Sequence, residues 1–176
     1  MNQLVEDYIQ HLTLERGLSQ NTVTSYRRDL LGFFQSSGQA DPLKVSAEVV
    51  SGYVALLTRS GRKASTIARK LSSLKQFYRY LVENNHVRSN PVTPFAAPKI
   101  ARYHPAYLMP QEIERIIEAA DQNTVAGTRN RAIVELLYGS GLRISELLEL
   151  KLRDIEFEAG FVRVLGKGNK QRLVPL

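Results

Sequence analysis

Five prolines lie within residues 91–110, and they divide the chain into two parts. Proline fixes its own φ angle and has no backbone N–H, so neither a helix nor a central strand continues through such a stretch. The stretch is typical of an extended, semi-stiff linker. We therefore expect a helical domain over residues 1–90, a linker over 91–108 and a second domain over 109–176.

The first part shows apolar residues at helical spacing in four segments. The predicted helices run from about Gln3 to Arg16, from Gln20 to Gln35, from Ser46 to near Gly61, and from Ser65 to Glu83. Ser19 is placed to cap the second of them. Tyr26, Tyr53 and Tyr78 lie on the apolar stripes, so we expect core positions for these side chains.

The second part begins with a helix whose first turn contains Pro110. Another helix is predicted from about Arg129 to Tyr138, with Tyr138 packed, and a short one follows a Gly-Ser-Gly break. After Asp154 the period shifts towards two, and a Gly-Lys-Gly-Asn turn separates the last two alternating runs. The expected fold class is mainly α with a small antiparallel β-hairpin sheet.

Composition narrows the function classes. The formal charge of +7 and the pI near 9.8 favour a polyanionic partner, with nucleic acid first and an anionic membrane surface second. The absence of cysteine excludes disulfides, thiolate catalysis and Cys-based zinc sites. The three histidines show no ligand spacing, so we expect no metal and no cofactor. No signal peptide or membrane-spanning run is visible, which fits a cytoplasmic protein.

The positive charge is concentrated around the fourth predicted helix. Between Val49 and Val82 there are seven basic residues and no acidic one. On a helical wheel, four polar side chains of this helix lie opposite its apolar stripe, where they suit groove and phosphate contacts. The alternative is a solvated basic face. The DNA contacts expected in this domain are Arg28, Arg62, Lys63, Ser65, Arg69, Ser73 and Gln76.

Arg143 stands at the start of the short helix that follows the Gly-Ser-Gly break. A cation there opposes the helix dipole, so the guanidinium either extends into solvent or grips an anion such as a phosphate. Glu146, one turn later, is placed to hold that guanidinium. The alternative is an exposed Arg–Glu pair that contributes little.

The predicted hairpin carries a second group of cations. Lys167 lies in the Gly-Lys-Gly turn, has no packing role there, and could stabilise charge or donate a proton beside a phosphate. Lys170 and Arg172 follow on the same hairpin, and we expect both to contact DNA. A solvated hairpin tip is the alternative for these last two.

Two stretches of the second part, "LLYGSGLRISELLELKLRDIEF" and "VRVLGKGNKQRLVPL", resemble the tyrosine recombinase, or phage integrase, family and its Xer type. In the first part, "GLSQNTVTSYRRDLLGFF", "STIARKLSSLKQFYRYL" and "NPVTPFAAPK" resemble the family's four-helix SAM-like core-binding domain and linker. The resemblance implies that the second part begins a mixed α/β catalytic domain.

The resemblance also implies a function: site-specific exchange of duplex DNA strands through a 3′-phosphotyrosyl bond, without metal or other cofactor. Arg143 would be the first catalytic arginine, Glu146 its support and Lys167 the general acid. Family members act as tetramers of recombinase protomers on DNA. Chromosome partition at cell division and integration of a mobile element both remain open as biological roles.

The family's later His-x-x-Arg motif and nucleophilic tyrosine find no counterpart in these 176 residues. We therefore expect an incomplete form that binds DNA without cutting it and is monomeric off DNA. One alternative is a stand-alone DNA-binding module without chemistry. Another is a helical protein of a membrane surface, which fits the basic charge but not the inward aromatic stripes.

Overall fold

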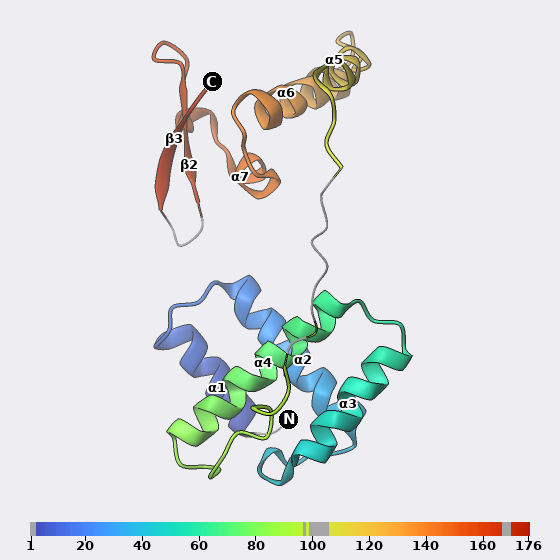
Figure 1. The fold of residues 1–176 in the computed structure, drawn as a ribbon. Coiled ribbons are helices and arrows are strands. Elements are labelled where there is room, and N and C mark those ends of the chain that lie inside the picture. The colour runs from blue at the N-terminus through green and yellow to red at the C-terminus, as the bar shows by residue number, and fades with distance from the viewer. Residues whose placement is uncertain (1–2, 97, 99–105, 167–169) are drawn as a thin grey trace. The chain divides into compact units, whose positions relative to one another are not determined.

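The computed structural model describes residues 3–96, 98, 106–166 and 170–176. The chain forms two compact units, Met1–Tyr103 and His104–Leu176 (Figure 1). The division falls inside the segment that the prolines mark as a linker.

The first unit is a bundle of helices. Its elements are α1 (Gln3–Leu14), α2 (Gln20–Ser37), the short 3-10 helix η1 (Pro42–Lys44), α3 (Ala47–Arg59) and α4 (Ala64–Glu83). The Ser19 side chain accepts a hydrogen bond from the backbone N–H of Thr22, which confirms Ser19 as the cap of α2. Gly38 ends α2 with a φ of 69°, a left-handed conformation that glycine adopts without strain. The four predicted helices are therefore all found within the described residues.

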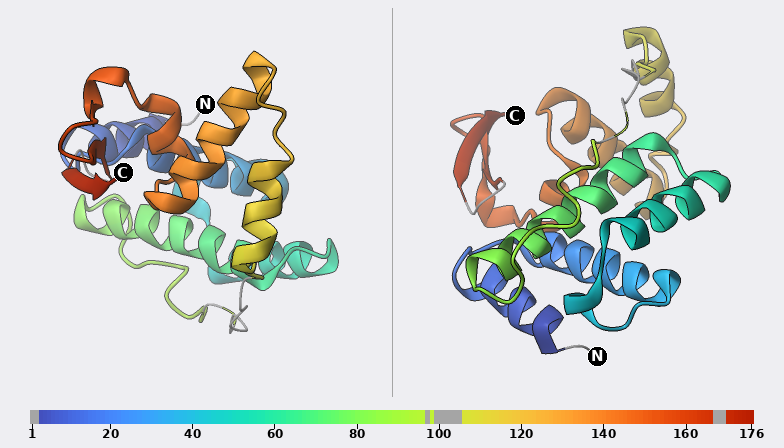
Figure 2. Two further views of the ribbon diagram at one scale, coloured as in Figure 1. Left: turned by 90° about the horizontal axis from the view of Figure 1, so that it is seen from above. Right: turned by 60° about the horizontal axis from the view of Figure 1, so that its bottom comes forward.

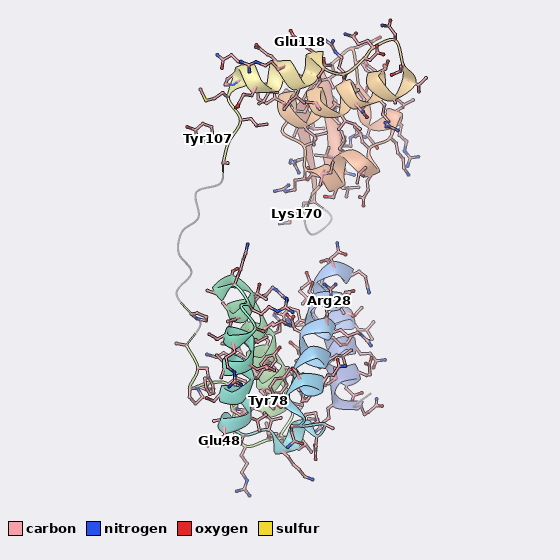
Figure 3. The ribbon with its side chains drawn as sticks, turned by 90° about the vertical axis from the view of Figure 1, so that its right-hand side faces the viewer. Arg28, Glu48, Tyr78, Tyr107, Glu118 and Lys170 are labelled. Carbon is pink, nitrogen blue, oxygen red and sulfur yellow. The ribbon has the colours of Figure 1, made fainter. Side chains whose placement is uncertain are left out.

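The helix α2 contacts each of the other three helices, and α4 lies beside it (Figures 1 and 2). Phe33 of α2 and Phe77 of α4 are completely buried in the shared core. Tyr78 lies between the helices (Figure 3), and its hydroxyl donates to the carbonyl of Pro42 at 3.0 Å, which ties α4 to η1. Tyr53 is also buried, as predicted. Tyr26 is partly buried against the same core.

The first unit continues past residue 90, where the sequence analysis ended it. Val92 is buried in the helical core, and Phe95 packs against that core. The first residues of the proline-rich segment therefore belong to the packed domain, because their apolar side chains find room on the helices despite the irregular backbone.

The second unit combines three helices with a small sheet. Its elements are α5 (Pro110–Glu118), α6 (Val125–Gly139), α7 (Ile144–Glu149), the 3-10 helix η2 (Leu152–Asp154), β1 (Ile155–Glu156), β2 (Phe161–Leu165) and β3 (Gln171–Pro175). The sheet has the order β1-β2-β3 and both pairings are antiparallel. Helix α6 begins at Val125 rather than near Arg129, because Thr124 caps it by accepting from Gly127 N–H at 3.0 Å.

The core of the second unit is small. Leu142, Val162 and Val164 are its buried residues, and side chains of α6, α7 and β3 pack around them. Tyr138 is exposed, so the prediction that it packs was wrong. Leu136 and Leu137 supply the packed face of α6, and Tyr138 lies a further 100° or so around that helix.

The expected fold class is confirmed within the described residues: mainly helical, with one small antiparallel sheet. Among the helices that the structure describes, none combines the length and the apolar character needed to cross a membrane.

Candidate functional site

Arg143 is held by its backbone and presents its side chain outward. It is the N-cap residue of α7, with extended backbone angles. Gly141, two residues earlier, has a φ of 59° and makes the sharp turn that separates α6 from α7. Leu142 between them is buried. The Arg143 side chain is 67% exposed, so an anchored backbone carries a guanidinium that solvent reaches.

Glu146 is the buried centre of this site. Its Oε2 accepts from the backbone N–H of Arg143 at 2.8 Å, and its Oε1 accepts from Arg143 Nη1 at 3.0 Å. The support of Arg143 by Glu146, inferred from their spacing, is therefore present in the geometry. Both carboxylate oxygens also accept from Arg172, at 2.5 Å from Nη1 and 2.8 Å from Nη2. The side-chain hydrogen bonds from Arg172 and the backbone N–H of Arg143 lower the pKa of Glu146 to about 2.

Arg172 does not lie free at a hairpin tip. It is on β3, opposite Val164 of β2, and its side chain is 35% exposed. Both of its terminal nitrogens donate to Glu146, which raises the pKa of Arg172. The Arg172 guanidinium, which we expected to contact DNA, is therefore bound to the Glu146 carboxylate in this structure.

Lys167, expected to act as the general acid, lies outside the described residues together with positions 168 and 169. Lys170 is exposed at the start of the return strand (Figure 3). Its carbonyl accepts from the backbone N–H of Gly166 at 2.7 Å. The described part of the hairpin is therefore a closed antiparallel pair that brings Arg172 back to α7.

A hollow of about 510 Å³ is lined by Glu146 and by residues of α7, η2 and the sheet. Three cations that the sequence analysis did not single out are among its lining residues: Lys151, Arg153 and Arg163. The only signal for them in the sequence is that basic residues recur on both sides of the turn into the sheet. Glu149 and Asp154 line the same hollow and offset part of that positive charge.

The basic face of the first unit is partly as predicted. Arg28, Arg62, Lys63 and Ser65 are exposed, and Gln76 is half-buried. Lys63 is the N-cap residue of α4. Arg69 has a side chain that is 51% exposed. These positions leave cations of α2 and α4 open to solvent.

The prediction that Ser73 is exposed was wrong. It was placed on the exposed face of α4, but it is only 4% exposed, and its hydroxyl donates to Asp29 Oδ2 at 2.9 Å. The helical wheel gave its angle, but it could not show that α2 covers this side of α4. Ser73 therefore has no surface to offer to DNA in this structure.

Asp29 of α2 is almost completely buried beneath the basic face. It forms ion pairs with Arg69 and with Lys70, whose Nζ lies 3.2 Å from Oδ1. An acid on α2 therefore offsets part of the positive charge of the acid-free stretch in α3 and α4. Nearby, burial and then the charge of Asp29 raise the pKa of Tyr53 to about 12, while Arg69 and Arg62 act to lower it.

The chain matches two family models in sequence order. The phage integrase N-terminal SAM-like domain matches residues 5–85, and the phage integrase family model matches residues 106–176.

Curated relatives match along almost the whole chain. Tyrosine recombinase XerD of Listeria monocytogenes serotype 4b is 36% identical, with 100% of this chain and 61% of that protein covered. XerD of Oceanobacillus iheyensis is 38% identical, with 98% and 59% covered. Tyrosine recombinase XerC of Thermodesulfovibrio yellowstonii is 34% identical, with 98% and 57% covered. The chain therefore spans roughly 60% of the length of these relatives.

Solved structures share the fold. A lambda integrase dimer bound to a COC′ core site has a TM-score of 0.77 at 22% identity, over 98% of this chain and 60% of that one. The integrase of transposon Tn1549, in complex with circular intermediate DNA, has a TM-score of 0.70 at 24% identity, over 99% and 59%. These likenesses concern the fold alone. The two family models and the Xer relatives confirm the resemblance seen in the sequence: the chain belongs to the phage integrase family of tyrosine recombinases.

Proposed function

We propose that this chain is the DNA-gripping part of an Xer-type site-specific recombinase, which cuts and rejoins duplex DNA through a 3′-phosphotyrosyl intermediate. The observation that carries the proposal is the arrangement around Glu146. An exposed guanidinium on Arg143 is fixed by a buried carboxylate, which a second arginine, Arg172, also binds.

This arrangement suits a phosphodiester. A guanidinium offers parallel N–H donors that match two phosphate oxygens, and it remains charged at every working pH. A fixed donor stabilises charge that develops on those oxygens better than a mobile one does, because no reorganisation is needed during the reaction. In the proposal, Arg143 grips the scissile phosphate and Lys167 protonates the leaving 5′ oxygen.

The first unit would supply affinity. Arg28, Arg62, Lys63, Ser65, Arg69 and Gln76 are the proposed contacts to the DNA backbone and groove there, joined by Lys170 in the second unit. The net charge of +7 supports this reading, because released counterions drive such binding. Ser73, which lies buried against Asp29, is no longer among the proposed contacts.

The partners are proposed on the same footing. Among the structural neighbours are a lambda integrase dimer on a core site and a lambda integrase tetramer on a Holliday junction. We propose that this chain meets a second recombinase protomer on DNA, is monomeric off DNA, and acts in the cytoplasm. We propose chromosome partition at cell division as the biological role, with integration of a mobile element as the alternative.

Duplex binding by the 176-residue polypeptide, measured by fluorescence anisotropy at several salt concentrations, tests the first half of the proposal. We expect log Kd to rise linearly with log salt, with a slope of about 0.9 per phosphate neutralised. Absence of binding at low salt would contradict the proposed function.

A suicide substrate that traps covalent protein–DNA adducts tests the second half. These 176 residues contain no His-x-x-Arg sequence, so we expect this polypeptide to bind the substrate without forming an adduct. A covalent band on a denaturing gel would contradict that part of the proposal and would require a nucleophile within residues 1–176.

A further inference from the structure

We propose that Arg172 is a positioning residue that orients Arg143 through Glu146 and makes no DNA contact of its own. The inference deepens the proposed function, on which it rests for the identity of the anion that Arg143 binds.

The hydrogen bonds give Arg172 its place. Each oxygen of Glu146 accepts one bond from each arginine: Oε1 from the two Nη1 atoms, and Oε2 from Arg143 backbone N–H and Arg172 Nη2. Without Arg172, the carboxylate on the six-residue helix Ile144–Glu149 would be held by Arg143 alone. The fork of Arg172 sets the plane of the carboxylate, and that plane sets the direction from which Arg143 Nη1 is held.

The two arginines differ in what they leave unused. Both terminal nitrogens of Arg172 are engaged, and its side chain is half as exposed as that of Arg143, at 35% against 67%. Of the guanidinium nitrogens of Arg143, only Nη1 donates a hydrogen bond to a residue that the structure describes. The free edge for an anion therefore belongs to Arg143.

Gly166 leaves space for the Arg172 guanidinium beside Glu146. A Cβ atom placed on Gly166, just after β2, would lie 3.2 Å from Arg172 Nη1 and 3.4 Å from the carbonyl of Lys170. Any side chain there would press on the fork from the strand side. With one carboxylate between two guanidinium groups, the cluster keeps one net positive charge, so it can still attract a phosphate.

The alternative is that Arg172 leaves Glu146 and contacts a phosphate directly. A double-substitution cycle on the 176-residue polypeptide separates the two. Arg143→Ala is expected to weaken duplex binding about tenfold and to lower the salt slope by about one. Arg172→Gln is expected to act in the same direction, and the double variant to be no worse than Arg143→Ala alone. Independent, multiplying losses and a slope lowered by about two would overturn the proposal.

Lys170→Ala provides the matched control, because Lys170 lies on the same hairpin, is exposed and is a proposed direct contact. Its effect should multiply with that of Arg143→Ala. If Arg172→Gln fails to fold, Arg172→Lys keeps the charge. An ammonium cannot bind both carboxylate oxygens as a planar fork, so the lysine variant is expected to repeat the glutamine result.

A second measurement does not depend on DNA. The Nε–H resonance of Arg143, followed by NMR on arginine-labelled protein, reports how firmly its guanidinium is held. Arg172→Gln is expected to shift and broaden that resonance, and Lys170→Ala to leave it unchanged. If wild-type protein fails to bind duplex, the proposed function falls, and this resonance still decides the present inference. An Arg143 signal indifferent to Arg172→Gln would overturn it.

Discussion

Replacement of Asp29 by asparagine removes a negative charge that is buried beneath the basic face of the first unit. Asp29 accepts hydrogen bonds from Ser73 Oγ at 2.9 Å and from Lys70 Nζ at 3.2 Å, and it also forms an ion pair with Arg69. Asparagine keeps the shape, but it carries no charge and turns an N–H₂ group towards one of these donors. The substitution therefore tests whether one buried acid holds α2 to α4.

The size of the effect follows from what is left unpaired. Removing one partner of a buried ion pair costs about 3–5 kcal/mol. Arg69 is half exposed and can return to water, whereas the Lys70 side chain is only 18% exposed and cannot do so freely. We therefore expect the lower end, about 3 kcal/mol of unfolding free energy. For a domain of this size, that corresponds to a fall in Tm of about 12–24 °C.

Urea unfolding followed by near-UV circular dichroism gives the measurement. The buried tyrosines belong to the first unit, whereas Tyr107 and Tyr138 of the second are exposed, so the signal reports on the helical bundle. Glu83→Gln, which breaks the exposed Arg79–Glu83 pair, is the control and should cost less than about 0.5 kcal/mol. If Asp29→Asn cost no more than this control, the ion pair would not be what fastens the two helices.

Three further outcomes are expected. Because the pKa of Glu146 falls from an ordinary 4.5 to about 2 on folding, the stability that it gives the second unit should be complete above pH 4.5. It should be lost between pH 4.5 and 2, and an acid titration that is unchanged in Glu146→Gln would contradict this. Tyr78→Phe leaves the buried carbonyl of Pro42 without its donor and should cost about 1–3 kcal/mol in urea unfolding. Arg69→Ala should lower the salt slope of DNA binding by about one, whereas Ser73→Ala should destabilise the unit and leave the slope unchanged.

The helices of the first unit could be predicted because their signals are local. Apolar residues at helical spacing mark α1 to α4, and Ser19 marks the start of α2. The start of α6 was placed too late because Val125 to Thr128 carry no apolar stripe, and the cap at Thr124 was not recognised. A threonine at this place in the sequence is a possible cap, and its hydrogen bond from Gly127 N–H in the structure identifies it as one.

The candidate site divides in the same way. Arg143 and Glu146 are one turn apart on a single helix, so their pairing follows from spacing alone. Arg172 binds Glu146, 26 residues away, from a neighbouring strand. Asp29 binds partners 40 or more residues away on a packed helix. Periodicity specifies neither of these tertiary contacts. The helical wheel of α4 gave the angle of Ser73 correctly, but it could not say that α2 would cover that angle.

Both units use one buried acid to hold two cations of unequal exposure. Asp29 holds Arg69 and the more buried Lys70, and Glu146 holds Arg143 and the more buried Arg172. Each acid lowers the net charge, yet each also fixes a donor whose ordering would otherwise cost side-chain entropy on binding.

These two effects predict opposite results for DNA affinity when an acid is neutralised. Glu146→Gln raises the formal charge from +7 to +8, and long-range attraction alone would then tighten binding. If the acids act by positioning, both Glu146→Gln and Asp29→Asn should instead weaken binding to duplex, measured by anisotropy where each variant is folded. Glu83→Gln adds the same charge at an exposed pair and serves as the reference. Tighter binding by all three variants alike would mean that the buried acids serve stability only, and that the exposed arginines need no such support to bind phosphate.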